Sequence, residues 1–145
     1  QYLKEGHLRW DSLGEYLAIA VSLEHMAETT GNQRAAGLAK ALNQAIERLL
    51  ENRKSPGRKV NQLDNRASNF YIGLYWSEFM AEIDPAYKEL ADKLCTSRGA
   101  IVEELKGCQG KPVDAGGYYM FDDAKVGAAM NPSTTLNKII AEANN

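Results

Sequence analysis

Four cations crowd one short stretch of this sequence, KSPGRKVNQLDNR, which covers residues 54–66. The basic residues in it are Lys54, Arg58, Lys59 and Arg66. A guanidinium group can bind a phosphate through two parallel hydrogen bonds. Binding groups also tend to lie on connections between regular elements, and this stretch separates two helical patterns. The first chemistry that the residues indicate is therefore recognition of an anion.

Arg9 is a second candidate for the same chemistry, in the stretch HLRWDSLGEY. It lies just before a predicted helix start at Asp11 or Ser12. The first N–H groups of a helix lack partners within it and point along the positive end of its dipole, which favours an anion nearby. The residues alone leave an alternative open, in which Arg9, Arg58 and Arg66 pair with surface carboxylates or water.

Other reaction chemistry has no motif in this chain. The patterns GxGxxG, GxxxxGKS/T, HExxH and GxSxG are all absent. Two pairs of carboxylates are adjacent in sequence: Glu103 with Glu104, and Asp122 with Asp123. Sequence neighbours point away from each other on a helix, so we expect these pairs to be solvated rather than catalytic. His7 and His25 have no neighbour in sequence that would make a base or a metal site, and we predict no catalytic or metal-binding residue.

Composition limits the possible partners and compartments. The 145 residues carry 17 basic and 19 acidic side chains, and a net charge of −2 argues against nucleic acid as a partner. Cys95 and Cys108 fit no zinc spacing and are predicted to be free thiols in a reducing cytoplasm. No apolar run approaches the roughly 20 residues of a membrane span, and no signal peptide is visible, so we expect a cytoplasmic protein without a membrane partner.

The elements that must position these residues are predicted to be mainly α-helical. Periodicity and breaker residues predict five to six helices, at about residues 12–30, 33–53, 64–82, 85–94 with a restart at 96 or 97 towards 106, 122–130, and from 131–133 onward. Ser12 and Glu15 have the spacing of a capping box. The glycine-rich stretch 107–121 excludes a regular helix and is expected to hold a short extended segment at Val113 and residues 118–121.

Two of these helical patterns are more apolar than a small bundle requires. Residues 12–30 and 64–82 place apolar side chains on more than one face, which is typical of helices surrounded by protein. Residues 33–53 have a single apolar stripe, formed by Leu38, Leu42, Ala45, Ile46 and Leu49. The opposite face of that helix is expected to be solvated, with Arg34, Lys40, Glu47 and Arg48. We therefore expect the chain to pack against segments that it does not contain.

Three stretches of the chain resemble one known family: EGHLRWDSLGEYLAIAVSLEH, NRKSPGRKVNQLDNRASNFYIGLYW and GKPVDAGGYYMFDDAKV. The family is the monomeric type of NADP-dependent isocitrate dehydrogenase, and the similarity to its C-terminal region runs through essentially all 145 residues. The resemblance implies that residues 1–145 are the C-terminal part of a large α/β coenzyme-binding domain. It also implies that a second domain, inserted upstream, supplies most ligands of isocitrate and of the divalent metal.

The same resemblance assigns a role to the cations. The residues that match coenzyme-contacting positions of the family are Arg9, Trp10, Asp11 and Arg58. The two arginines match those that hold the 2′-phosphate of NADP, and this phosphate is thus the anion expected at Arg58. A histidine of the same clamp lies just before the family's counterpart of Gln1 and is absent here. Arg66 receives no coenzyme role, and we predict helix capping or an internal ion pair for it.

The implied function is that of the complete enzyme, with these residues as one segment. It oxidatively decarboxylates isocitrate to 2-oxoglutarate with NADP and Mg²⁺ or Mn²⁺, as a monomeric bacterial enzyme of the tricarboxylic acid cycle and glyoxylate bypass. Residues 1–145 alone are expected to be inactive and to self-associate. The alternative is a stand-alone helical module that binds a partner protein without catalysis. The reading frame upstream of Gln1 separates the two: continuity favours the enzyme, a start or stop codon the module.

Overall fold

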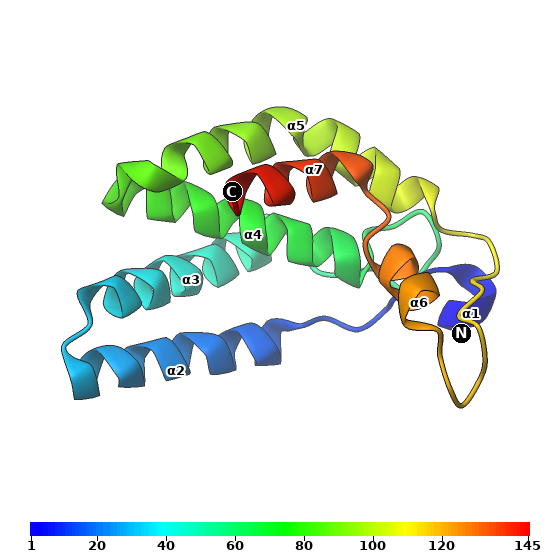
Figure 1. The fold of residues 1–145 in the computed structure, drawn as a ribbon, viewed down its shortest axis with the longest axis horizontal. Helices are drawn as coiled ribbons and strands as arrows, with labels where there is room; N and C mark the ends of the chain where they lie inside the picture. The colour runs from blue at the N-terminus through cyan, green and yellow to red at the C-terminus, as the bar shows by residue number, and fades with distance from the viewer.

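The computed structural model describes residues 1–145 and contains seven α-helices, one 3-10 helix and no β-strand (Figure 1). In chain order the elements are α1 (Tyr2–Glu5), α2 (Leu13–Thr30), α3 (Gln33–Glu51), α4 (Asn65–Ile83), the 3-10 helix η1 (Pro85–Tyr87), α5 (Lys88–Gly107), α6 (Asp123–Met130) and α7 (Thr134–Ala143). The predicted mainly α class is confirmed. The helix beyond the expected five to six is α1, which has only four residues.

The long helices pack in chain order. α2 and α3 form an antiparallel pair, α3 packs on α4, α4 on α5, and α7 lies against α5 (Figure 1). α1 and α6 lie together at one end of the molecule, near the connection that follows α5 (Figure 1). The chain therefore has an elongated helical body and a compact end that gathers the shorter elements.

Side-chain caps define most helix starts. The N-cap side chains that accept a backbone N–H are Asn32 for α3, Asp64 for α4, Asp122 for α6 and Ser133 for α7. The predicted starts at these positions are confirmed. The predicted capping box at Ser12 and Glu15 is wrong, because Ser12 makes no cap bond. Its Oγ instead accepts a hydrogen bond from Nδ2 of Asn65 at 2.8 Å, so a tertiary contact uses the hydroxyl.

α5 is longer and more regular than the sequence predicts. No break occurs at residues 95–97, and the helix runs without interruption from Lys88 to Gly107. Its side chains at Leu94, Ile101 and Leu105 are buried and lie in one apolar core with residues of α4. Packing of this continuous face outweighs the weak cap signal of a Thr-Ser pair.

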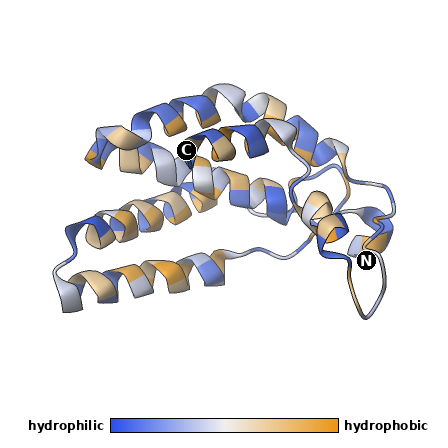
Figure 2. Cartoon of the chain, in the orientation of Figure 1, coloured by the Kyte–Doolittle hydropathy of each residue, from blue (hydrophilic) through white to orange (hydrophobic).

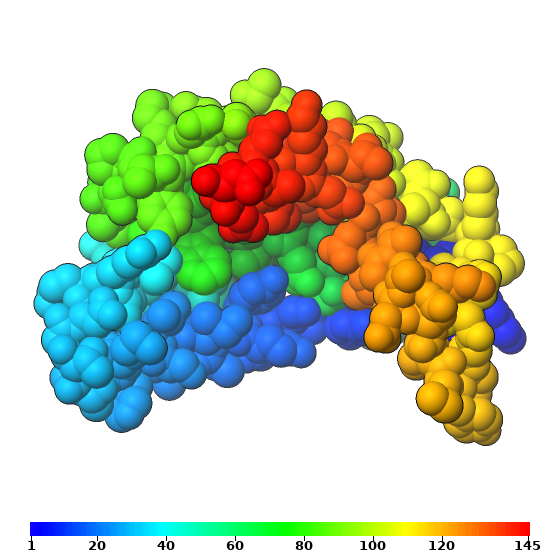
Figure 3. Space-filling model, in the orientation of Figure 1, coloured from blue at the N-terminus to red at the C-terminus, as the bar shows by residue number.

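The glycine-rich stretch forms a closed loop instead of a strand. The N–H of Asp122 donates to the carbonyl of Ala115 at 2.8 Å and closes the loop between them. Tyr119 at its tip is 92% exposed, and the space-filling view shows the loop projecting from the end of the body (Figure 3). The extended segment expected at residues 118–121 is therefore not part of any sheet.

The hydrophobic core lies mainly between α3, α4 and α5. The predicted apolar stripe of α3 faces this core: Leu42, Ala45, Ile46 and Leu49 are buried and Leu38 is half-buried. The expectation that Arg48 is solvated is wrong. This side chain is half-buried, binds Glu78 at 2.9 Å and lies 3.9 Å from the centre of the Phe79 ring.

α2 is not surrounded by protein within this chain. Ala20 is its one buried residue, and Val21 is 63% exposed. Leu17, Ile19 and Met26 are exposed as well. Figure 2 shows hydrophobic residues along α2, which packs mainly on α3. The helix that the sequence predicts to be covered on several faces thus has an uncovered apolar surface here.

Glu104 is held by side chains of the chain itself, which corrects the expectation that this carboxylate is solvated. Its carboxylate accepts hydrogen bonds from Oγ of Ser133 at 2.5 Å and Oγ1 of Thr135 at 2.7 Å. It therefore ties α5 to the first turn of α7. These hydroxyl bonds lower the pKa of Glu104 from its ordinary value of 4.5, because they stabilise the ionised form. Glu103 points outward, with 78% of its side chain exposed.

We expect Glu104→Gln to destabilise the fold at neutral pH more than Glu103→Gln does. The pKa of Glu104 is lower in the folded protein than in the unfolded chain, so its stabilisation is fully present above the unfolded value of 4.5. It is lost as the pH falls through the lower folded value. Denaturant unfolding from about pH 3 to pH 7 should show the two variants converging in acid. A constant difference between them at every pH would contradict this role.

Candidate anion-binding site

Arg58 lies on a loop that the chain closes on itself. The N–H of Gly57 donates to the carbonyl of Leu63 at 2.7 Å, and we call residues 57–63 the Arg58 loop. Inside it, the N–H of Lys59 donates to Oε1 of Gln62 at 3.1 Å. A Cβ on Gly57 would collide with the Gln62 side chain, so glycine allows this close packing. The loop is therefore compact rather than an open connection.

The cations of the Arg58 loop face solvent. Arg58 and Lys59 are both exposed, and neither forms an ion pair within the chain. The nearby Lys54 is half-buried, with its Nζ 4.9 Å from the centre of the Tyr71 ring. The guanidinium of Arg58 is thus free to bind an anion, as predicted, whereas the ammonium group of Lys54 packs against the Tyr71 ring.

The predicted residues before α2 are also exposed. Arg9 binds Glu5 at 3.3 Å, with 44% of its side chain exposed. Exposed pairs of this kind contribute little stability, so a phosphate can replace the carboxylate. Trp10 is 56% exposed. Asp11 is exposed and accepts a long hydrogen bond of 3.4 Å from the N–H of Leu13.

The backbone brings the two arginine-bearing segments together. Nε2 of His7, two residues before Arg9, lies 2.8 Å from the carbonyl oxygen of Gly57, one residue before Arg58. Further along, the N–H of Asn65 donates to the carbonyl of Leu8 at 2.9 Å. Residues 7–10 therefore run against both the Arg58 loop and the start of α4. This arrangement suits a phosphate site shared by the two segments.

Arg66 belongs to a buried ion pair, as predicted. Its Nη2 is 2.6 Å from Oδ2 of Asp64, and 5% of the Arg66 side chain is exposed. The same guanidinium donates to the carbonyl oxygens of Gly6 at 2.6 Å and Ala129 at 2.7 Å. Arg66 thus joins the start of α4, the N-terminal segment and the end of α6, and it is unavailable to a soluble anion.

His7 is the residue whose surroundings the sequence did not indicate. It is 1% exposed, and both ring nitrogens have partners: Oε1 of Gln109 at 2.9 Å and the carbonyl oxygen of Gly57 at 2.8 Å. These partners lie 102 and 50 residues away in sequence, so no local spacing could reveal them. His25, in contrast, is exposed on α2.

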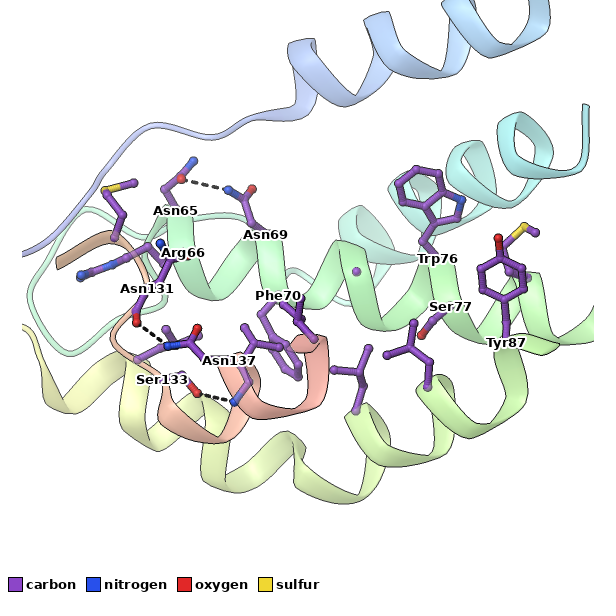
Figure 4. Close-up of a pocket in the computed structure, with 18 of the residues that line it drawn as sticks. Asn65, Arg66, Asn69, Phe70, Trp76, Ser77, Tyr87, Asn131, Ser133 and Asn137 are labelled. Atoms are coloured by element: carbon purple, nitrogen blue, oxygen red, sulfur yellow. Dashed lines mark hydrogen bonds between the residues drawn. The ribbon is translucent and has the colours of Figure 1, made fainter. Parts of the chain in front are cut away.

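A groove runs along α4 and is separate from the exposed arginines. Its volume is about 520 Å³, and most of its lining is apolar. Asn65 and Arg66 lie at one end of this groove, and Trp76 and Tyr87 lie at the other (Figure 4). Neither Arg9 nor Arg58 lines it. The groove is an uncovered apolar surface of the helical body, distinct from the candidate anion site.

Two other kinds of site can be assessed from the side chains. No group of three or more His, Cys, Asp or Glu residues is arranged to hold a metal ion. None of the helices has the length and apolar character needed to cross a membrane.

Comparison with known proteins gives a consistent result along the chain. The family described as monomeric isocitrate dehydrogenase matches residues 1–141. Relatives named NADP isocitrate dehydrogenase are 48% identical in a Psychrobacter species, 46% in Colwellia maris and 45% in Azotobacter vinelandii. Each match covers 97% of this chain but 20% of the relative. The chain thus spans about one fifth of the length of these relatives.

Proposed function

Because the chain belongs to the monomeric isocitrate dehydrogenase family, we propose that residues 1–145 form the C-terminal part of the coenzyme-binding domain of a longer chain. Two features support this proposal. The relatives are about five times as long, since each match covers 20% of their length. The apolar face of α2 and the 520 Å³ groove along α4 are surfaces that a larger domain would cover. We expect the same surfaces to make residues 1–145 self-associate when they are isolated.

We propose that the longer chain oxidatively decarboxylates isocitrate to 2-oxoglutarate with NADP. The names of the relatives support the substrate and the coenzyme. NADP, when bound, accepts the hydride that leaves C2 of isocitrate. Residues 1–145 contain no group of three or more His, Cys, Asp or Glu side chains that would form a complete site for Mg²⁺ or Mn²⁺. We therefore assign metal binding and catalysis to other parts of the longer chain.

The role we propose for this segment is selection of NADP through its 2′-phosphate. Arg58 and Arg9 would hold the phosphate, with Trp10 and Asp11 contacting the coenzyme beside them. The observation that carries the proposal is the exposed Arg58, which has no ion pair and lies on a closed loop bonded to the Arg9 segment. Hydrogen bonds to charged groups contribute about 1.5–3 kcal/mol each, enough to separate NADP from NAD. The donor set fits a phosphate, because a guanidinium can donate to two of its oxygens.

Competition by coenzyme fragments tests this role directly. In the longer chain, 2′,5′-ADP should compete with NADP at least about tenfold more strongly than 5′-AMP does, because the two fragments differ only in the 2′-phosphate. Inhibition constants measured against NADP at saturating isocitrate give the comparison. Equal competition by the two fragments would show that the 2′-phosphate is not a recognised group.

A further inference from the structure

A buried polar cluster anchors the Arg58 loop from two distant parts of the chain. Its side chains are His7, from the N-terminal segment, and Gln109, from the connection after α5. They are 1% and 6% exposed. Neither residue is among the groups to which the proposed function assigns a coenzyme contact. Their hydrogen bonds show what they do instead.

Gln109 holds the second half of the Arg58 loop. Its Oε1 accepts from the N–H of Asn61 at 2.9 Å, and its Nε2 donates to the carbonyl of Gln62 at 3.0 Å. An N–H on one side and a carbonyl on the other fix the orientation of the amide. The oxygen of Gln109 is consequently the atom that faces Nδ1 of His7, at 2.9 Å.

His7 holds the first half of the loop. Its Nε2 lies 2.8 Å from the carbonyl oxygen of Gly57, which belongs to the peptide bond that leads into Arg58. Both ring nitrogens therefore face acceptors, and the ring donates to both only when both nitrogens carry protons. His7 and Gln109 together hold three of the seven residues of the loop. Such a frame fixes the backbone from which Arg58 projects.

We propose that His7 and Gln109 are positioning residues, which hold the Arg58 loop in the conformation that meets the 2′-phosphate. This inference rests on the proposed function of Arg58. A cation on a preorganised loop loses less conformational freedom on binding, so the same contact gives a higher affinity. Removing these hydrogen bonds should consequently weaken the binding of NADP more than the binding of NAD, without changing the rate of the chemical step.

Two substitutions of His7 separate the contact to the loop from burial in general. In His7→Gln the amide nitrogen can take the place of Nε2 and keep the bond to the carbonyl of Gly57. In His7→Asn it can take the place of Nδ1, so the bond to Gln109 remains and the bond to Gly57 is lost. The exposed His25→Asn is the matched control.

The expected result is a selective change in the Michaelis constant, measured in the longer chain with NADP and with NAD. His7→Asn should raise KM for NADP about three- to tenfold, the effect of one lost hydrogen bond, with kcat and KM for NAD within about twofold. In His7→Gln, KM for NADP should stay close to its value in the unsubstituted protein, and in His25→Asn it should not change. Gln109→Leu, which loses both loop contacts, should show the same selective rise and serves as the test if His7→Asn does not fold.

The outcomes separate this inference from the proposed function. Arg58→Ala measured alongside reports on the function itself. If Arg58→Ala is selective for NADP while folded His7→Asn or Gln109→Leu leaves KM for NADP unchanged, the positioning role is wrong and the function stands. If the variants raise KM for NADP and KM for NAD by the same factor, His7 and Gln109 have a structural role only. If Arg58→Ala is itself unselective, the phosphate role fails and the positioning role fails with it.

Discussion

Replacing Arg66 by alanine is expected to lower the free energy of unfolding by about 3–5 kcal/mol, because removing one partner leaves a buried charge uncompensated. That charge is the carboxylate of Asp64, which is 0% exposed. The carbonyl oxygens of Gly6 and Ala129 would lose a donor in the same step. Three segments that meet at one guanidinium would thus be released together.

Denaturant unfolding of the Arg66→Ala variant measures this effect. Arg98→Ala is a suitable control, since Arg98 is exposed on α5 and forms no ion pair. We expect it to change stability by less than about 0.5 kcal/mol. The double variant Arg66→Ala with Asp64→Asn should lose less than the sum of the single changes, because neither charge then remains unpaired. A loss under about 1 kcal/mol for Arg66→Ala would show that water reaches Asp64 and that the pair is not a structural centre.

Local sequence signals predicted the starts of most helices. Asp64, Asp122 and Ser133 lie directly before apolar periodic stretches, and each accepts a hydrogen bond from the first turn of its helix. The signals failed where a tertiary contact used the same group. Ser12 has the right spacing for a capping box, but its hydroxyl accepts from Asn65. The predicted break in α5 failed because a continuous buried face outweighs weak local preferences.

The candidate site was predictable to a smaller degree. The residues alone indicated anion chemistry at Arg9 and Arg58, and family resemblance named the phosphate. The structure adds that both side chains are exposed and that their segments are bonded to each other. The coenzyme contacts themselves stay a prediction. The frame of His7 and Gln109 could not be found from spacing, because its contacts join residues 50 and 102 positions apart.

The coenzyme preference should depend strongly on Arg58. In the longer chain, Arg58→Ala should raise KM for NADP by roughly one to two orders of magnitude, from the loss of about 1.5–3 kcal/mol. KM for NAD should hardly change, because NAD has no 2′-phosphate. Arg66→Ala is expected to cost stability while keeping the preference for NADP, since its guanidinium is buried in other contacts. Steady-state kinetics with both coenzymes, at saturating isocitrate and metal, provide the measurement.

Arg9→Ala should show the same selectivity, with an added structural cost because Arg9 lies close to the start of α2 and binds Glu5. The double variant of Arg9 and Arg58 should lose less than the sum of the two single losses. Both guanidiniums would bind the same phosphate dianion and share in neutralising its charge. Removing the second arginine therefore costs less binding energy once the first has been removed. Strict additivity would place the two arginines on separate groups of the coenzyme. If Arg58→Ala raised KM for NADP and KM for NAD by the same factor, Arg58 would have a structural role instead of a phosphate contact.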